Sequence, residues 1–586
     1  MPTNENKFYD NPAYKEQALK SVQDVFVKEY KNSIGIPLPE IKFIFSDSDN
    51  YKTGEYYISI DETWQINLNF GLLPTSYKEF QEEVRVLTRH EVGHYMCCPF
   101  DIITHFRMLK SIIDVYNKYY VRKFSALNII QLAGSLSNQA ADIIVDTVSF
   151  NRNKPETLKS EIAWIKKGSG FHGMPRHNKL MFLTKQTLWK ESLELEETDE
   201  ELLAEVKTLS DKFEKGGIGN KEYFLEKVEA YTHTFFRLFE QDIQEHQQDS
   251  SSGSGSGQSQ NGRPQQGQQS DGQGQSQGSG QPQPSPSKDS QQYGSQFIFQ
   301  SPDKVQEALA EIAQETSMQM FSQILSAAGF SSLSDKDKEK IWFEAQSADM
   351  IPIDEETPMG SNDNYSYPTT WKLGDPIEDI DMMLTFANSP VFIPGITTKK
   401  WEHNSVFNYG TEKKQCDLLL VIDTSYSMGN VADENTNMHQ AVLAAYGLIR
   451  YFESKQGQVA LIGFSDRITV DIEWTKNYDE VKDKLLITGN GNTIFPIQRV
   501  LSEIEKSKNA IVTVVITDGE IQNIQNSLDF FREYLNDGNK LYIFLQNRKT
   551  NVNIEYIVLR NVGAKIIPAL TAKEMCESVL DGIYEN

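Results

Sequence analysis

The chain has 586 residues, of which 39% are hydrophobic, and a formal net charge of −25 at pH 7. That length is too great for one hydrophobic core and predicts two or three domains, while the acidic balance excludes broad binding to the phosphates of nucleic acids. Without a run of roughly 18 apolar residues, an apolar signal-peptide core or a repeating cysteine spacing, the sequence predicts a cytoplasmic protein with reduced thiols and no membrane partner.

The first predicted domain, residues 1–248, combines helices with a small β element, which is the pattern of an α+β domain. Short apolar runs predict strands at 41–45, 56–61 and 64–70, the last two as a hairpin around Glu62 and Thr63. Longer periodic segments predict helices at 12–32, 77–96, 103–120 and 126–150.

The segment LTRHEVGHYMCCP, residues 88–100, places two histidines four positions apart on the helix predicted at 77–96. Side chains at i and i+4 lie on one helix face, so His90 and His94 can aim their imidazoles at one zinc ion. Glu91 can then take a proton from a water that the metal makes more acidic. The alternative is an ordinary buried helix, because such a pattern arises by chance in about one chain of this size in a hundred.

The helix predicted at 126–150 supplies further candidates, since Asp142 and Asp146 are the only charged residues in the stretch 128–150. Two carboxylates in an apolar helix are costly to bury unless they meet a cation. The arrangement resembles the gluzincin class of zinc metallopeptidases, in which an acid ligand follows on a later helix and an Asp four residues beyond it orients a metal-bound histidine. The resemblance implies Asp142 as the third zinc ligand, in place of the usual Glu, and Asp146 as the partner of a histidine. Because Asp is shorter than Glu, either acid stays open as the ligand that reaches zinc.

Other residues near this motif are expected to have less specific roles. Cys97 and Cys98 are expected to be small buried residues at a helix end, with redox chemistry or metal binding as alternatives. His172 and His177, in GFHGMPRH, are expected in a solvated loop, although one of them could polarise a substrate carbonyl. His105 is expected to be structural.

Composition changes sharply after the first domain. Residues 249–295 are predicted to be a disordered linker, because the stretch 250–287 is almost entirely Ser, Gly, Gln and Pro and has little apolar surface to bury. Flexible-chain scaling gives this stretch an end-to-end distance of roughly 35 Å, enough for the flanking domains to separate or dock. Residues 296–410 are predicted as a connector, with helices at 302–329 and 334–348 and an irregular stretch at 350–410.

Residues 411–586 alternate near-continuous apolar strands with amphipathic helices. This alternation predicts a mostly parallel sheet covered on both faces, that is, a doubly wound, Rossmann-like α/β domain. The expected strands are 416–423, 458–464, 510–518, 540–546 and 564–570, and the expected helices are 437–454, 493–507, 523–536 and a last one near residue 586.

The segment VIDTSYSMG places Asp423, Ser425 and Ser427 directly after the first of these strands. Thr493, in TGNGNT, and Asp518, in VVITDGE, lie in other loops that can converge on it, because ligand sites in such sheets collect at the carboxyl ends of strands. Carboxylate and hydroxyl oxygens are the hard ligands that Mg²⁺ prefers. The alternative is a plain α/β domain in which these residues only cap helices.

This set resembles the von Willebrand factor A (VWA) domain with a complete metal-ion-dependent adhesion site. The resemblance implies that Asp423, Ser425 and Ser427 form the primary metal loop and that Thr493 and Asp518 come from the second and third loops. It also implies that a Glu or Asp of a protein partner fills an open position on the Mg²⁺ ion.

The two halves together are similar to bacterial or archaeal proteins that join a zinc metallopeptidase domain to a VWA domain. The resemblance alone implies a MoxR-type AAA ATPase as partner; no GxxxxGK[ST] motif occurs in this chain, so another chain must supply any ATP-driven step. The preferred interpretation is a zinc-dependent peptidase that cleaves a peptide or protein substrate, with Glu91 as general base. The alternative is a non-catalytic adaptor that docks to the ATPase and keeps a structural or vestigial zinc domain.

Overall fold

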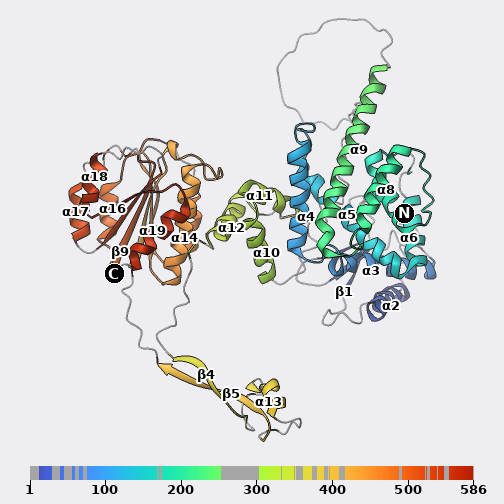
Figure 1. The fold of residues 1–586 in the computed structure, drawn as a ribbon, viewed down its shortest axis with the longest axis horizontal. Coiled ribbons are helices and arrows are strands. Elements are labelled where there is room, and N and C mark those ends of the chain that lie inside the picture. Colours follow the sequence, from blue (N-terminus) through green and yellow to red (C-terminus); the bar gives the residue numbers. More distant parts are fainter. Residues whose placement is uncertain are drawn as a thin grey trace. The chain divides into compact units, whose positions relative to one another are not determined.

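The chain forms two units, residues 1–346 and 347–586, in the computed structural model (Figure 1). The predicted linker lies outside the described residues except at 249–252, and so do Glu62 and Thr63. The structure describes residues 12–29, 40–44, 56–59, 65–69, 76–167, 171, 174–252, 302–330, 333–348, 350–351, 361–371, 376, 379–388, 394, 396–407, 416–486, 491–519, 521, 523, 528–536, 539–546, 554–561 and 563–584.

The first unit is mostly helical, as the sequence predicts. Its helix α4 continues into a π-helical turn, η3 (Tyr116–Tyr120), and a 3-10 turn, η5 (Lys221–Tyr223), precedes α9. The helices are α2 (Pro12–Glu29), α3 (Tyr77–Met96), α4 (Ile102–Val115), α5 (Ile129–Arg152), α6 (Lys154–Lys167), α7 (Arg176–Trp189), α8 (Glu200–Glu214), α9 (Phe224–Ser252), α10 (Pro302–Gln314), α11 (Met318–Ala327) and α12 (Asp335–Ala348).

A small sheet of order β1-β3-β2 accompanies these helices. Strand β3 (Gln65–Asn69) lies between β1 (Glu40–Ile44), with which it is parallel, and β2 (Tyr56–Ser59), with which it is antiparallel. The antiparallel pair confirms the predicted hairpin. Strand β2 contacts α3, so this sheet lies beside the helix that carries the two histidines of HEVGH.

Helices α3 and α5 pack directly against each other, and α5 also contacts α4, α7 and α9. Because α5 is apolar on nearly all sides, it is stable only when other helices surround it. Gly93 allows the close approach of α3: a Cβ atom at this position would lie 2.4 Å from Cγ1 of Val145 on α5.

Replacing Gly93 with Ala is expected to destabilise the first unit by about 1–2 kcal/mol, because the overpacked contact outweighs the better helix propensity of alanine. Denaturant unfolding followed by circular dichroism measures the change. Gly219→Ala is the matched control, since a Cβ there meets only ordinary contacts at 3.5 Å. A Gly93→Ala protein as stable as the wild type would show that α3 and α5 can separate without cost.

Two predictions for the predicted connector are wrong. The helix predicted at 302–329 is divided into α10 and α11, because the side chain of Ser317 caps α11 by accepting a hydrogen bond from the Met320 amide. The stretch predicted as irregular contains α13 (Met382–Asn388) and two antiparallel strands, β4 (Ser361–Thr370) and β5 (Lys399–Phe407). These strands are rich in polar residues and pair only with each other among the described residues, so they lack the apolar alternation that reveals a strand facing a core.

The second unit is built on a six-stranded sheet of order β11-β10-β9-β6-β7-β8, parallel except for the edge strand β8. It confirms the predicted α/β domain, and β8 is an antiparallel strand that the sequence analysis missed. The strands are β6 (Cys416–Asp423), β7 (Val459–Phe464), β8 (Ile468–Thr475), β9 (Ala510–Thr517), β10 (Lys540–Leu545) and β11 (Lys565–Pro568). The helices are α14 (Asn437–Ser454), α15 (Tyr478–Leu485), α16 (Ile497–Ile504), α17 (Leu528–Asn536), α18 (Ile554–Asn561) and α19 (Ala572–Tyr584).

Helices cover both faces of this sheet. Figure 1 shows α16, α17 and α18 on one side of the strands and α14 and α19 on the other. Alternate residues of β6 face opposite sides, so Leu419 and Val421 join the core that includes Phe531 of α17 and Leu559 of α18. This double cover buries the central strands and leaves the loops at their carboxyl ends free to build a site.

Candidate functional sites

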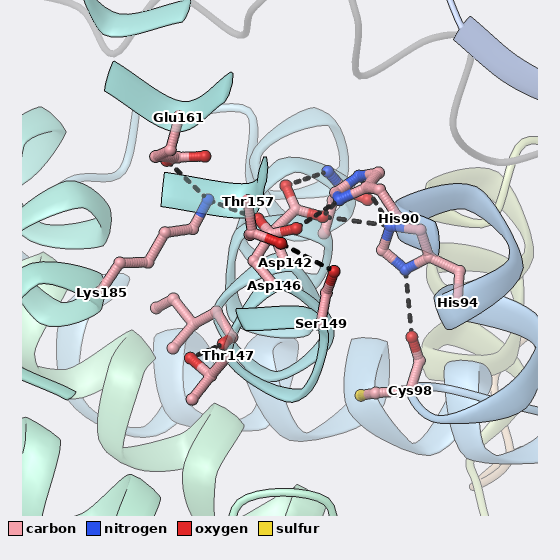
Figure 2. A network of polar contacts seen from close by, with 12 residues as sticks. His90, His94, Cys98, Asp142, Asp146, Thr147, Ser149, Thr157, Glu161 and Lys185 are labelled. Carbon is pink, nitrogen blue, oxygen red and sulfur yellow. Dashed lines mark hydrogen bonds and ion pairs between the residues drawn. The ribbon is translucent and has the colours of Figure 1, made fainter. Parts of the chain in front are cut away.

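The predicted zinc ligands meet between α3 and α5 (Figure 2). His90 and His94 come from α3, and Asp142 of α5 points toward both. The Nε2 atoms of the histidines are 3.3 Å apart, and Asp142 Oδ1 lies 3.7 Å from His90 Nε2 and 3.1 Å from His94 Nε2. One potential ligand atom of each residue therefore faces the same point.

The other ring nitrogens of the histidines face hydrogen-bond acceptors. His90 Nδ1 lies 2.7 Å from Asp146 Oδ1, and His94 Nδ1 lies 3.0 Å from the carbonyl oxygen of Cys98. An ionised carboxylate and a carbonyl only accept, so both Nδ1 atoms donate, and each neutral imidazole keeps its lone pair on Nε2. Metal-bound histidines are oriented by partners of this kind.

The three converging atoms fit a zinc ion. Asp142 Oδ1 is buried and has no hydrogen-bond donor among the described residues, while its Oδ2 accepts from Asn138 Nδ2 at 3.0 Å. Donors around a tetrahedral zinc ion, at about 2.0–2.1 Å from it, lie about 3.3 Å apart. The observed separations of 3.1–3.7 Å bracket that value. In the protein alone, burial opposes the charged form of His90, but Asp146, Asp142 and Glu91 raise its pKa to about 10.

A buried lysine that the sequence analysis missed completes the network. Lys185 of α7 places its Nζ 2.5 Å from Asp146 Oδ2 and 3.0 Å from Glu161 Oε1 of α6 (Figure 2). Burial opposes ionisation of Asp146, yet Lys185 and His90 hold the pKa of this carboxyl well below its usual range. Lys185 of α7 therefore keeps Asp146 ionised and oriented toward His90. The residues of α3 alone do not fix this orientation.

The structure also locates the other histidines and cysteines of the first unit. Cys98 is buried and Cys97 is half-buried after the end of α3, and His105 is buried on α4, where burial lowers its pKa to about 3. The solvated loop predicted for His177 is wrong: its ring is buried at the start of α7 and its Nδ1 lies 2.6 Å from Asp242 Oδ2 of α9. His172 lies outside the described residues.

Glu91 is buried on α3, one position after His90. Its negative charge contributes to the raised pKa of His90, and Glu91 is not one of the three convergent residues.

The predicted magnesium residues lie at the carboxyl edge of the sheet in the second unit. Asp423 ends β6, and its Oδ1 accepts a hydrogen bond from the Ser425 amide at 2.9 Å. The hydroxyls of Ser425 and Ser427 are 3.1 Å apart. Asp423 is fully buried, and burial raises its pKa despite these hydrogen bonds, with the charge of Asp518 acting in the same direction. A carboxylate and two hydroxyls that lie close together are oxygen ligands of the kind that a hard cation such as Mg²⁺ prefers.

Two neighbouring loops converge on this group. The Thr517 hydroxyl, at the end of β9, donates a hydrogen bond to Asp423 Oδ2 at 2.7 Å. The sequence analysis missed this role of Thr517. The next residue is the buried Asp518. The loop with the buried Thr493 lies beside the primary loop, because the Tyr426 amide donates to Gly491 O at 3.4 Å. The Ile494 amide also donates to Ser465 O, directly after β7, at 2.8 Å. Parallel pairing of β6 with β7 and β9 brings these loops to one edge.

No helix of the described residues combines the length and the apolar composition that crossing a membrane requires.

Comparison with known proteins adds a family for part of the second unit. No curated protein matches the chain. Solved structures that resemble it include an aerotolerance-related membrane protein from Bacteroides fragilis, at 15% sequence identity, and the conserved hypothetical protein BatB from Bacteroides thetaiotaomicron, at 13%. Each match covers 29% of this chain and 100% of the other chain, with a TM-score of 0.24. The PilB minor pilin from Streptococcus sanguinis, at 12% identity and a TM-score of 0.24, spans 32% of this chain and 64% of its own.

Residues 418–520 match the family described as the von Willebrand factor type A domain. The matched segment runs from β6 to the loop after β9, so it contains the converging loops and all five predicted magnesium residues. The second unit of the chain therefore contains a von Willebrand factor type A domain.

Proposed function

We propose that the chain is a zinc-dependent metallopeptidase of the gluzincin type whose VWA domain recruits a protein partner. The observation that carries the proposal is the triangle of His90 Nε2, His94 Nε2 and Asp142 Oδ1, with sides of 3.1–3.7 Å. Three protein ligands leave the fourth position of a tetrahedral zinc site for water, which is the composition of catalytic rather than structural sites.

Each residue of the site has a proposed role. Bound zinc would lower the pKa of a water molecule and polarise the carbonyl of the scissile peptide bond. His90 and His94 are the proposed imidazole ligands, with His90 losing a proton when zinc binds, and Asp142 is the proposed anionic ligand. Asp146 holds His90 in the tautomer that exposes Nε2. Glu91 is the proposed general base, which accepts a proton from the attacking water and returns it to the leaving amine.

The Glu91→Gln variant tests this assignment. We expect it to keep one zinc ion per chain and to lose about 10²- to 10⁴-fold in kcat for a short unstructured peptide, because the amide cannot accept the proton. Metal analysis and a fluorogenic peptide assay measure the two quantities. Glu79→Gln, an exposed position in the first turn of α3, is the control. Loss of zinc from Glu91→Gln, or hydrolysis at the wild-type rate, would remove Glu91 from the proposed role.

The second proposed site is a Mg²⁺ ion held by Asp423, Ser425 and Ser427, with Thr493 and Asp518 contributing from the neighbouring loops. The hydrogen bonds around Asp423 and the all-oxygen donor set support it. A carboxylate of a protein partner would complete the coordination. A MoxR-type AAA ATPase is the proposed partner on the resemblance of the whole chain alone.

The VWA match favours a second candidate function, a non-catalytic adaptor with a structural or vestigial zinc domain. Both candidates require the VWA domain to bind a partner, so they differ only in the first unit. Wild-type protein with one zinc ion per chain that captures a partner but cleaves neither a generic peptide nor that partner would establish the adaptor.

A further inference from the structure

A cavity of about 290 Å³ lies beside the contact of α3 with α5, close to the zinc residues, since Ser149 in its lining follows Asp142 by seven positions on the same face of α5. On α3, the residues that line it recur every three or four positions and so form one face, next to the face of His90 and His94. The cavity is lined by Arg89, Gly93 and Met96 of α3, by Cys97 directly after it, by Val145, Val148, Ser149 and Arg152 of α5, and by Gly219 and Lys221.

The charge of this cavity is opposite to that of the whole chain. Its lining contains three cations, Arg89, Arg152 and Lys221, and no Asp or Glu, although the chain carries a net charge of −25. Glu156 neutralises Arg89, whose Nη1 lies 2.8 Å from its Oε2. Arg152 and Lys221 form no ion pair with the described residues, and both are exposed to solvent.

The two uncompensated cations line the same cavity from different elements, Arg152 from the end of α5 and Lys221 from η5. Burial raises the pKa of the Cys97 thiol in this lining, and Arg152, Lys221 and Lys227 oppose that shift. Lys221 Nζ lies 3.2 Å from the centre of the Phe100 ring, a cation–π contact that restrains the ammonium group. An anion that enters would therefore meet positive charge from Arg152 of α5 and from Lys221 of η5.

Apart from the Ser149 hydroxyl and the Cys97 thiol, the uncharged part of the lining is apolar. Met96, Val145 and Val148 form a wall without hydrogen-bonding side-chain groups apart from a thioether, and such a wall excludes water from a small ligand without orienting it. A hydrated inorganic ion gains nothing from this surface, whereas a molecule with a short hydrocarbon part does.

We infer that the cavity binds a small organic anion, with its carboxylate between Arg152 and Lys221 and its apolar body against Met96, Val145 and Val148. The chemistry is shared by the carboxyl-terminal residue of a peptide and by a free short organic acid. The inference requires no metal and is independent of the proposed peptidase.

Calorimetric titration of the full-length chain tests the site with N-acetyl-leucine, which has the carboxylate and the apolar side chain. N-acetyl-leucine amide removes the charge, and inorganic phosphate removes the apolar body. We expect N-acetyl-leucine to bind at least tenfold more tightly than either, because charge-assisted hydrogen bonds and apolar contact act together. An N-acetylated tripeptide that ends in leucine separates the sources: tighter binding identifies a peptide terminus, and equal or weaker binding identifies a free acid.

Arg152→Gln and Lys221→Gln are each expected to weaken N-acetyl-leucine binding tenfold or more. Both side chains are exposed, so the variants should fold, which far-UV circular dichroism checks. Arg122→Gln, an exposed arginine outside the lining, should bind as the wild type does. Unchanged affinity in Arg152→Gln, equal binding of the amide, preference for phosphate, or no binding of N-acetyl-leucine at 10 mM would each overturn the inference.

Discussion

Replacing His90 with Ala is expected to lower zinc affinity by about 10²- to 10³-fold and to abolish peptide hydrolysis. Structural zinc sites with four ligands bind with about 10–16 kcal/mol at pH 7, so one ligand accounts for about 2.5–4 kcal/mol. Asp142→Ala should have a comparable effect, because it removes the atom that faces both Nε2 atoms. Competition with a chromogenic chelator measures the affinities.

The Asp146→Ala variant separates a ligand from the residue that orients it. It should cost only about 10- to 100-fold in affinity, which is typical when a partner of a ligating histidine is lost. His233→Ala, on α9 and away from the cluster, controls for loss of a histidine. If Asp142→Ala kept the wild-type affinity while Asp146→Ala lost zinc, Asp146 would be the ligand and the proposed roles would be reversed.

The Asp423→Ala variant is expected to reduce Mg²⁺-dependent partner capture at least about tenfold, because the buried carboxylate is the only charge in the primary loop. Zinc content and hydrolysis of a short peptide should stay nearly unchanged, since neither uses Asp423. Isotope-labelled pull-downs from native lysate, with Mg²⁺ or with chelator, compare the captured proteins.

Two further variants make that experiment specific. Ser425 and Ser427 replaced together by Ala leave the buried Asp423 and its hydrogen bond from Thr517 in place, so they test the metal loop with less risk to folding. Asp479→Ala, exposed in the first turn of α15, is the control. Identical partner lists for the wild type and Asp423→Ala would contradict the docking role, and loss of peptide hydrolysis in Asp423→Ala would show that the two activities are coupled.

Elements with one strong period could be predicted closely from the sequence. Helix α3 spans Tyr77–Met96, the predicted bounds, because its apolar residues recur at helical spacing and Pro99 prevents its continuation. Strand β6 also has its predicted bounds, since a run of apolar residues buried on both faces has few other solutions. By contrast, β4 and β5 have mostly polar sequences, so no apolar period marks them. Strand β8, ITVDIEWT, does alternate apolar and polar residues, so this edge strand was readable from the sequence although it was missed.

The candidate sites show the same limit at the level of single residues. In HEVGH the four-residue spacing places His90 and His94 on one face of the same helix, so their proximity could be predicted from the sequence. Lys185 is one of two lysines within α7, and only the packing of α7 on α5 turns it inward to Asp146. His177 follows a Gly–Met–Pro–Arg sequence typical of a loop, yet α7 begins just before it. Its ring nitrogen Nδ1 forms a hydrogen bond with the carboxylate of Asp242, 65 residues later. Contacts between helices far apart in sequence leave no local pattern.

The buried Lys185 has a consequence for how the protein responds to metal supply. Its ammonium group balances Asp146 and is shared with Glu161, so the carboxylate beside His90 is compensated by the chain itself. Small zinc domains whose ligands have no other partners unfold when the metal leaves. Here the Lys185 ammonium group supplies the counter-charge and the fold has a large apolar core, so we expect the chain to stay folded without the metal. If the proposed zinc site is occupied, loss and return of the metal should then be reversible without unfolding of the chain.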